Sequence, residues 1–330
     1  MNTLIQTNGL IRYGHYSNPV DLINYEDFDL KTSSGISVHK LVKKLLFKQF
    51  IFVGITGPEL IAGLAVVDLK YITNGFFYVY NRRTGKLWET KHLGPGSADV
   101  YIRPLPEKID SRYQSRKLSI CLKNDKISAR GDGVTLNATL NLNKPRPLRL
   151  CTRTGYRGWS YTQKTAPIEI SGEIRFKNTR ISVSSPDCLA LIDWTAGYMR
   201  RNTFWNWAAA ASSLPDNRTL GLNLACGVNE TGFTENTFWL DNRITRTGPV
   251  NFVFNKDDLY SDWRITSGDR KINLVFTPES GRKEKVNALV VASDFTQLMG
   301  VFKGNLTADD GEVITISGCS GWVEDHFAKW

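Results

Sequence analysis

The sequence predicts an all-β protein made of two consecutive antiparallel β-barrels or half-barrels, with little helix. Short runs rich in β-branched and aromatic residues follow one another along the chain, and turn residues separate them. Hardly any segment shows a capped stripe with the 3.6-residue period of a helix, which argues against a parallel α/β fold. With 330 residues, the chain is long enough for two domains, which we place at residues 1–165 and 166–330.

The first predicted elements surround an apolar stretch. Val38–Leu46 is the best helix candidate, although it fits an initial strand equally well. Phe47–Thr56 and Leu60–Tyr71 flank Gly57-Pro58 and predict a hairpin. The apolar stretch Phe50–Val67 carries a charge and turn residues near its middle, so two strands fit it better than a membrane span.

The following segments continue the β pattern. In Lys117–Leu122 apolar and polar residues alternate, which predicts a strand with one buried face, and Asn124-Asp125 predicts a turn after it. Leu142–Thr165 is rich in Pro, Arg and Gly, so we expect it to connect the two halves. The other predicted strands are Gly75–Asn81, Lys86–Thr90, Lys126–Arg130, Thr135–Leu142, Ile168–Phe176, Leu189–Trp194, Thr203–Ala210, Thr219–Cys226, Thr237–Leu240, Asn251–Phe254, Lys271–Phe276, Lys285–Ala292, Gln297–Leu306 and Glu312–Ser317.

Composition and cysteine usage suggest a compartment. Hydrophobic residues make up 41% and charged residues 22% of the chain, as in globular proteins. Met1–Tyr16 lacks the basic start and apolar core of a secretory signal. The cysteines are odd in number and widely spaced, which predicts free thiols in a reducing, cytoplasmic compartment. They are Cys121, Cys151, Cys188, Cys226 and Cys319.

The sequence offers no pattern for a cofactor or a metal. The four histidines are not within helical or hairpin spacing of one another, so we expect no metal. The phosphate-binding and nucleophile motifs G-x-x-x-x-G-K, G-x-G-x-x-G and G-x-S-x-G are missing. We therefore expect no cofactor, and the oligomeric state stays open.

Positive charge is concentrated in the first half of the chain. Residues 1–165 hold 25 Lys and Arg against 12 Asp and Glu, whereas residues 166–330 hold 17 against 20. This asymmetry fits binding to nucleic acid or contact with an anionic membrane surface. It fits better with an ordinary polar barrel exterior, so we expect nucleic-acid binding to fail experimentally.

The most unusual composition lies between Gly155 and Trp239, which hold five of the nine tryptophans among scattered polar residues. Aromatic walls with a few polar groups favour a pocket for a lipophilic ligand, and a tryptophan-rich core explains the pattern as well. Alternation places Trp205 and Trp207 on one face of a strand. The candidate ligand-binding residues are Arg157, Trp159, Tyr198, Arg200, Arg201, Trp205, Trp207, Asn223 and Trp239.

Asp193 is the candidate catalytic residue. It ends the apolar run Leu189–Asp193 beside Trp194, an environment in which a carboxyl group serves as a proton donor. The competing interpretation, which we favour, is a structural ion pair between Asp193 and Arg200 or Arg201.

Several motifs resemble the bacterial DUF2804 family of uncharacterised proteins. The resemblance covers most of the chain. It rests on the segments Gly158–Lys164, Leu191–Tyr198, Thr203–Ala208, Asn223–Gly227, Leu240-Asp241, Gly248–Val250, Trp263–Ile265, Leu274–Pro278 and Asp310–Glu312.

A weaker resemblance, carried by Gly158-Trp159-Ser160 and the segment around Asp193, extends to the lipocalin-like carotenoid hydratase and AttH group. It implies two lipocalin-like, calycin-type barrels with a lipophilic pocket, in an architecture shared by hydratases, tocopherol cyclases and Diels-Alderases. Trp159 would then correspond to an aromatic wall and Asp193 to an acid. This chain has Trp194-Thr195-Ala196 where the hydratase-like pattern has His and Glu, so the partners of that acid are missing.

The leading hypothesis is a protein that binds a lipophilic or amphipathic small molecule in a tryptophan-rich pocket, with arginines at an acidic head group. The second is a cofactor-independent lyase or isomerase, hydratase-like or cyclase-like, in which Asp193 donates a proton and tryptophans stabilise positive charge. The third is binding of nucleic acid or of an anionic membrane surface through the basic N-terminal half.

Overall fold

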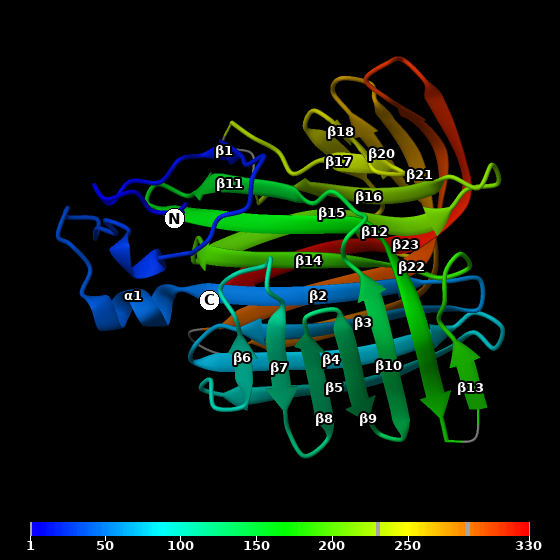
Figure 1. Cartoon of the computed structure of the whole chain (residues 1–330), viewed down its shortest axis with the longest axis horizontal. Helices are drawn as coiled ribbons and strands as arrows, with labels where there is room; N and C mark the ends of the chain where they lie inside the picture. The colour runs from blue at the N-terminus through cyan, green and yellow to red at the C-terminus, as the bar shows by residue number, and fades with distance from the viewer. Residues whose placement is uncertain (1, 178, 229–231, 288–290, 330) are drawn as a thin grey trace.

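The computed structural model describes residues 2–177, 179–228, 232–287 and 291–329. Strands make up 62% of the chain and helices 3%, which confirms the predicted all-β class. The strands form two curled, antiparallel half-barrel sheets that lie against each other (Figure 1).

The first sheet contains the strands from β1 to β14. They are β1 (Gly14–His15), β2 (Lys48–Thr56), β3 (Leu60–Asp68), β4 (Ile72–Asn81), β5 (Lys86–Pro95), β6 (Val100–Ile102), β7 (Asp110–Gln114), β8 (Leu118–Lys123), β9 (Lys126–Gly131), β10 (Val134–Asn141), β11 (Leu148–Thr154), β12 (Gly158–Phe176), β13 (Thr179–Ser182) and β14 (Leu189–Tyr198). Their main order is β5-β4-β3-β2-β14-β12-β10-β9-β8-β7-β6, and β11 and β13 also pair with β12. This order places β14 directly between β2 and β12.

The second sheet contains the strands from β15 to β23. They are β15 (Asn202–Ser213), β16 (Thr219–Cys226), β17 (Thr237–Leu240), β18 (Arg243–Arg246), β19 (Val250–Val253), β20 (Trp263–Ser267), β21 (Ile272–Asn287), β22 (Ala292–Thr307) and β23 (Val313–Lys329). Their order is β18-β17-β16-β15-β23-β22-β21-β20-β19. Strands β17, β18, β20 and β21 curl away from the first sheet at the upper right of Figure 1.

Three apolar cores stabilise this arrangement. The first sheet curls around a core that includes Trp159 and Trp194, and the second around a core that includes Trp263. A third core lies between the sheets and includes Trp207 and Trp322. The sheets therefore pack against each other with the faces that do not cover their own cores.

Alternate residues of strand β14 belong to two different apolar cores. All ten of its residues are buried, because both of its faces are covered. Ala190 and Ile192 belong to the core of the first sheet, whereas Leu189 and Leu191 belong to the core between the sheets. Since side chains alternate along a strand, Asp193 points toward the second sheet.

Close contact between the sheets depends on a glycine in β2. A Cβ atom at Gly54 would lie 2.5 Å from Cη2 of Trp322, far closer than normal van der Waals contact. The missing side chain therefore leaves room for the indole of the opposite sheet.

The expected connection between the halves lies elsewhere. Residues 142–165 form β11 and the first part of β12, both in the first sheet, and the sheets change between Tyr198 and Asn202. The division of the chain into folding units at residue 165 stays a prediction. The hairpins expected around Gly57-Pro58 and Asn124-Asp125 are present as β2–β3 and β8–β9. The predicted strand Lys285–Ala292 includes residues 288–290, which lie outside the described residues.

The described residues contain one α-helix, α1 (Lys40–Leu46), and one 3₁₀ helix, η1 (Tyr25–Asp27). The helix expected over Val38–Leu46 is therefore present from Lys40 onward. The His39 side chain caps α1 by accepting a hydrogen bond from the backbone N–H of Leu41. Neither of these described helices has the length and apolar content needed to cross a membrane. Cys121, Cys151, Cys188 and Cys319 are free thiols.

Candidate functional site

A cavity of about 170 Å³ lies between the two sheets. Aromatic side chains from both sheets form much of its wall, with Phe52 and Phe76 on one side and Trp205, Trp207 and Phe295 on the other. The rings of Phe52 and Trp207 meet edge to face with centroids 5.8 Å apart. The cavity thus has the aromatic walls that the sequence predicts.

A buried charge cluster lies in this wall, and we call Lys164, Asp193 and Glu235 the buried lysine cluster. Lys164 on β12 is directly opposite Asp193 on β14 in the strand register, so their side chains share one face. The Lys164 ammonium group donates to Oδ1 of Asp193 and lies 3.4 Å from Oε1 of Glu235. The three side chains are between 4% and 10% exposed.

Burial and charge act in opposite directions within this cluster. Burial disfavours the ammonium form of Lys164, but the two carboxylates outweigh it and hold the pKa of Lys164 above its ordinary value. Burial raises the pKa of Glu235, and the charge of Asp193 raises it further, whereas Lys164 opposes this shift. The cluster is therefore best described as an ammonium–carboxylate pair beside a second carboxyl group, Glu235, whose pKa is raised.

Polar neighbours fix the geometry of the buried lysine cluster. Thr195 donates to Oδ1 of Asp193 at 3.3 Å. The Asn223 amide donates to the backbone carbonyl and to Oε1 of Glu235, at 3.0 and 3.3 Å. Asn223 also accepts a 2.9 Å hydrogen bond from the indole N–H of Trp207. The indole is thus connected to the cluster through one amide.

A second carboxyl group, Glu324 on β23, lines the same cavity. Its oxygens accept hydrogen bonds from the indole N–H of Trp205 at 3.2 Å and from the amide of Gln297 at 2.7 Å. Burial raises the pKa of Glu324 to about 7, although these two hydrogen bonds oppose the shift. Within the described residues Glu324 forms no ion pair, so this environment favours the protonated acid much more than water does.

His326 lies two residues further along β23 and faces the cavity too. Its ring centroid is 4.1 Å from that of Trp205 and 4.7 Å from that of Phe295. Burial and the charge of Arg282 lower the pKa of His326 to about 3. The imidazole is therefore neutral at physiological pH and acts as part of the aromatic wall.

A hollow of about 550 Å³ adjoins the cavity, and four residues line both spaces, namely Lys48, Thr154, Met199 and Arg200. Lys48 donates to the backbone carbonyls of Leu45 and Leu69 at 2.9 and 2.7 Å. Burial lowers the pKa of Lys48 to about 7. Arg157 and Arg201 also line this outer hollow, so basic side chains surround the approach to the cavity.

The structure separates the predicted site residues into three groups. Asp193, Arg200, Trp205 and Trp207 line the inner cavity. Arg157, Tyr198 and Arg201 line the outer hollow, which Arg200 also reaches. Asn223, Trp159 and Trp239 line neither space, although Asn223 supports the cluster behind the wall.

Three of the expectations differ from the geometry. Trp159 faces the core of the first sheet, since it lies on the opposite face of β12 from Lys164. Trp239 is fully buried, and its indole N–H donates to the carbonyl of Arg146. The ion-pair partner of Asp193 is Lys164 and not Arg200 or Arg201.

Sequence reasoning missed Lys48, Lys164, Glu324 and His326. The signal for Lys164 was present, because it follows Ser160 and Thr162 at two-residue spacing and shares their face of the strand. Glu324 and His326 continue the face of Trp322 in the same way. Alternation along each strand does not show which strand lies next to it, so the sequence does not reveal that these faces surround one cavity.

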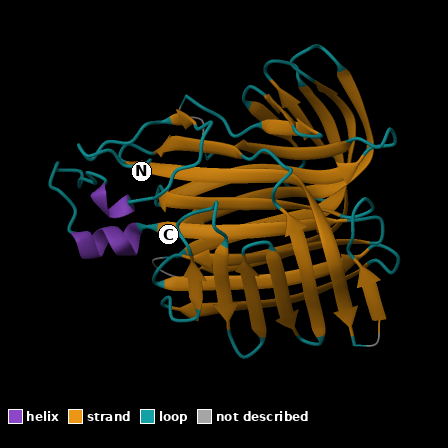
Figure 2. Cartoon of the chain, viewed as in Figure 1, coloured by secondary structure: helices purple, strands orange, loops and turns teal. Residues whose placement is uncertain are grey.

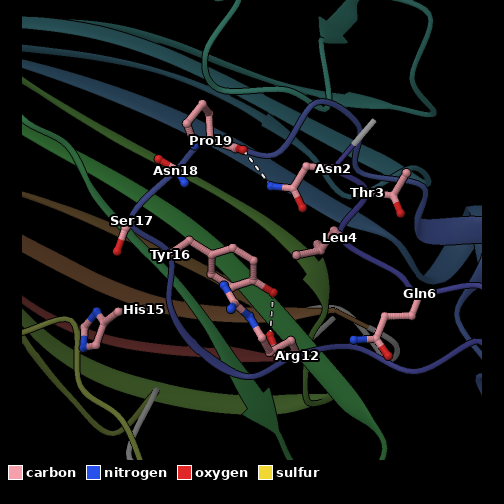
Figure 3. A pocket seen from close by; sticks show the side chains of 10 residues that line it. All are labelled: Asn2, Thr3, Leu4, Gln6, Arg12, His15, Tyr16, Ser17, Asn18 and Pro19. Carbon is pink, nitrogen blue, oxygen red and sulfur yellow. Dashed lines mark hydrogen bonds between the residues drawn. The ribbon is translucent and has the colours of Figure 1, made fainter.

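A separate hollow of about 960 Å³ lies under the N-terminal segment. Figure 3 shows Tyr16 donating from its hydroxyl to the carbonyl of Arg12 and the amide of Asn2 donating to the carbonyl of Pro19. Arg12 is the one residue with a formal charge among the ten that line it. The described residues that line this larger hollow do not include paired ionisable groups such as those of the inner cavity, which is therefore the stronger candidate site.

No group of three His, Cys, Asp or Glu side chains among the described residues is placed to hold a metal ion. Fold and site together define a lipocalin-like, two-sheet β protein with an aromatic cavity between its sheets. The chain belongs to the family described as Domain of unknown function (DUF2804), whose model matches residues 2–330. The family resemblance predicted from the motifs is thus confirmed.

Three solved structures share the fold. A protein assigned as AttH (NE1406) from Nitrosomonas europaea has 14% identity and a TM-score of 0.50, over 84% of this chain and 91% of that chain. Kievitone hydratase from Nectria haematococca has 9% identity and a TM-score of 0.51, over 86% and 88%. A protein named CghA has 8% identity and a TM-score of 0.54, over 100% and 97%. No curated protein matches the sequence.

Proposed function

We propose that the cavity between the two sheets binds a lipophilic or amphipathic small molecule. The observation that carries this proposal is the combination of an aromatic wall with a few fixed polar groups, which is typical of small-molecule sites. The inner cavity of about 170 Å³ is smaller than the roughly 300–1,000 Å³ of common ligand sites. A ligand of ordinary size therefore extends into the outer hollow and places a polar or acidic end near Arg200 and Arg201.

Binding of 1-anilinonaphthalene-8-sulfonate, an apolar probe with an anionic end, tests this proposal. We expect the wild-type protein to bind the probe, and Trp205→Leu to weaken binding about tenfold because it removes part of the aromatic wall. Trp88→Leu is the matched control, since Trp88 packs on Phe77 and Phe176 away from the cavity. Equal affinities for all three proteins would overturn the proposal. Native mass spectrometry of the protein from its own host would identify a retained ligand.

The second candidate function is that of a cofactor-independent lyase or isomerase. A specific observation favours it: one cavity holds an ionised carboxylate, Asp193, and a carboxyl group, Glu324, whose pKa is raised to about 7. An acid and a base with different environments are what proton transfer at a double bond requires. The similarity to kievitone hydratase concerns the fold alone, and it is consistent with this chemistry.

In this second proposal Glu324 donates the proton and the Asp193 carboxylate removes one. Asp193 thus acts as the base and not as the proton donor that the sequence suggests. The reason is that a carboxylate that accepts a hydrogen bond from an ammonium group has no proton to give. Turnover of a host lipid extract, followed by mass spectrometry, tests it. We expect Glu324→Gln and Asp193→Asn to retain probe binding and to lose turnover by a hundredfold or more. Unchanged turnover in both variants would leave ligand binding as the function.

A further inference from the structure

Helix α1 presents its apolar face to solvent. Leu41, Val42, Leu45 and Leu46 occupy adjacent positions on one side of the helix, and their side chains are 65%, 45%, 53% and 43% exposed. A surface helix normally turns such a face toward the core. Figure 2 shows the helix beyond the ends of the strands, where no sheet covers it.

The lysines of α1 hold the helix in this orientation. Lys43 donates to the backbone carbonyls of Glu26 and Phe28 at 2.9 and 2.6 Å. Lys40 and Lys44 pair with the Glu26 carboxylate at 2.9 and 3.5 Å. Rolling the helix to bury its leucines would break these contacts, so the exposed apolar face is part of the folded structure.

The charge around this face is positive. Residues 26–48 contain five lysines, of which Lys48 is buried, against the three acidic residues Glu26, Asp27 and Asp29. The side chains of Lys40 and Lys44 remain 68% and 51% exposed despite their contacts with Glu26. Exposed leucines flanked by lysines complement a membrane surface with anionic head groups, since the leucines enter the acyl boundary and the lysines meet the phosphates.

The helix also lies next to the approach to the cavity. Leu46, at its last turn, lines the outer hollow together with Leu30 and Lys48. A lipophilic molecule that leaves a membrane at this face would therefore meet the outer hollow first.

We propose that α1 docks the protein on an anionic membrane surface, with the outer hollow facing the lipid. A second copy of the chain fits this face less well, because two lysine-bearing helices placed face to face repel each other. The proposal goes beyond the proposed function, since membrane binding through α1 does not require an occupied cavity.

Co-sedimentation with vesicles tests the proposal. We expect about tenfold tighter binding to vesicles of phosphatidylcholine with phosphatidylglycerol than to vesicles of phosphatidylcholine alone. Leu41→Gln with Leu45→Gln should weaken binding to the mixed vesicles about tenfold without lowering the melting temperature, because both side chains are exposed in the free protein. Val253→Gln with Val313→Gln is the matched control, since these exposed residues lie on the second sheet.

Two results would overturn the proposal. One is equal binding of the wild type, the leucine variant and the valine control to the mixed vesicles. The other is a wild-type dimer in analytical ultracentrifugation that the leucine substitutions dissociate, which would assign the face to a second copy. Loss of vesicle binding in the leucine variant with unchanged probe binding in the cavity would separate membrane docking from the proposed function.

Discussion

The buried lysine cluster leads to a prediction about two carboxylates that share one ammonium group. Asp193→Asn keeps the shape of the side chain and removes its charge. Glu235 remains 3.4 Å from the ammonium group of Lys164 and supplies the remaining countercharge. We expect the single substitution to lower the free energy of unfolding by about 1–3 kcal/mol, the contribution of one hydrogen bond to a charged group.

Glu235→Gln alone should lower the free energy of unfolding less, because burial disfavours the charge of Glu235 and Asp193 remains hydrogen-bonded to Lys164. The double variant leaves the Lys164 ammonium group, which is 5% exposed, without a countercharge. An uncompensated buried charge costs about 3–5 kcal/mol. The two substitutions should therefore be non-additive, with a coupling energy of about 2 kcal/mol.

Urea unfolding of the four proteins at pH 7, followed by tryptophan fluorescence, measures this coupling. The matched control adds Lys164→Met to the double variant, which removes the unpaired charge and should restore much of the lost stability. If the two single effects add to within about 0.5 kcal/mol, the carboxylates do not share the lysine and the reasoning is refuted.

Three further predictions test other parts of the interface between the sheets. Because its pKa is raised, folded Glu324 binds a proton between pH 4.5 and about 7, whereas the unfolded chain does not. The free energy of unfolding of the wild type should therefore fall by about 3 kcal/mol relative to that of Glu324→Gln as the pH rises through this range. Urea unfolding of both proteins at pH 4.5 and 8 measures this change, and a difference that stays constant with pH would contradict the prediction. Gly54→Val should lower the free energy of unfolding by about 1–3 kcal/mol, because the new side chain clashes with Trp322. Adding Trp322→Leu to this variant should recover part of the lost stability, as thermal unfolding measures. Arg282→Met should lower the free energy of unfolding by about 3 kcal/mol, because it leaves Glu89, its ion-pair partner at 2.6 Å on the other sheet, without a countercharge. Adding Glu89→Gln to this variant should recover much of the lost stability in urea unfolding.

Much of the fold follows from local patterns in the sequence. Alternation along Lys117–Leu122 and the turn residues between the hairpins predict strands without reference to distant residues. The pairing of β2 with β14 is different, since it joins residues 48–56 to residues 189–198. Local periodicity carries no information about which distant strand becomes the neighbour. The Pro, Arg and Gly content of residues 142–165 predicts a connection, but β11 pairs with the first part of β12, which in turn pairs with β14 in the first sheet.

The site residues were predictable only as far as local alternation reveals them, as was the fold. Alternation placed Trp205 and Trp207 on one face, and both line the cavity. The same rule divides Trp159 from Lys164, yet it does not state which face meets the second sheet. Lys164 became the partner of Asp193 through the register of β12 against β14, which depends on long-range pairing. Arg200 and Arg201, the expected partners of Asp193, line the outer hollow instead.

The layer between the two sheets combines an apolar core with buried charges. Each sheet has its own apolar core, and a third core fills much of the layer between them. Buried charges there are costly, because apolar residues of similar volume would stabilise the layer as well or better. Lys164, Asp193, Glu235 and Glu324 nevertheless gather in this layer and around one cavity. Ionisable groups that reduce stability and converge on a cavity are more typical of a functional site than of a packed core, which is the physical reason to look for a ligand between the sheets.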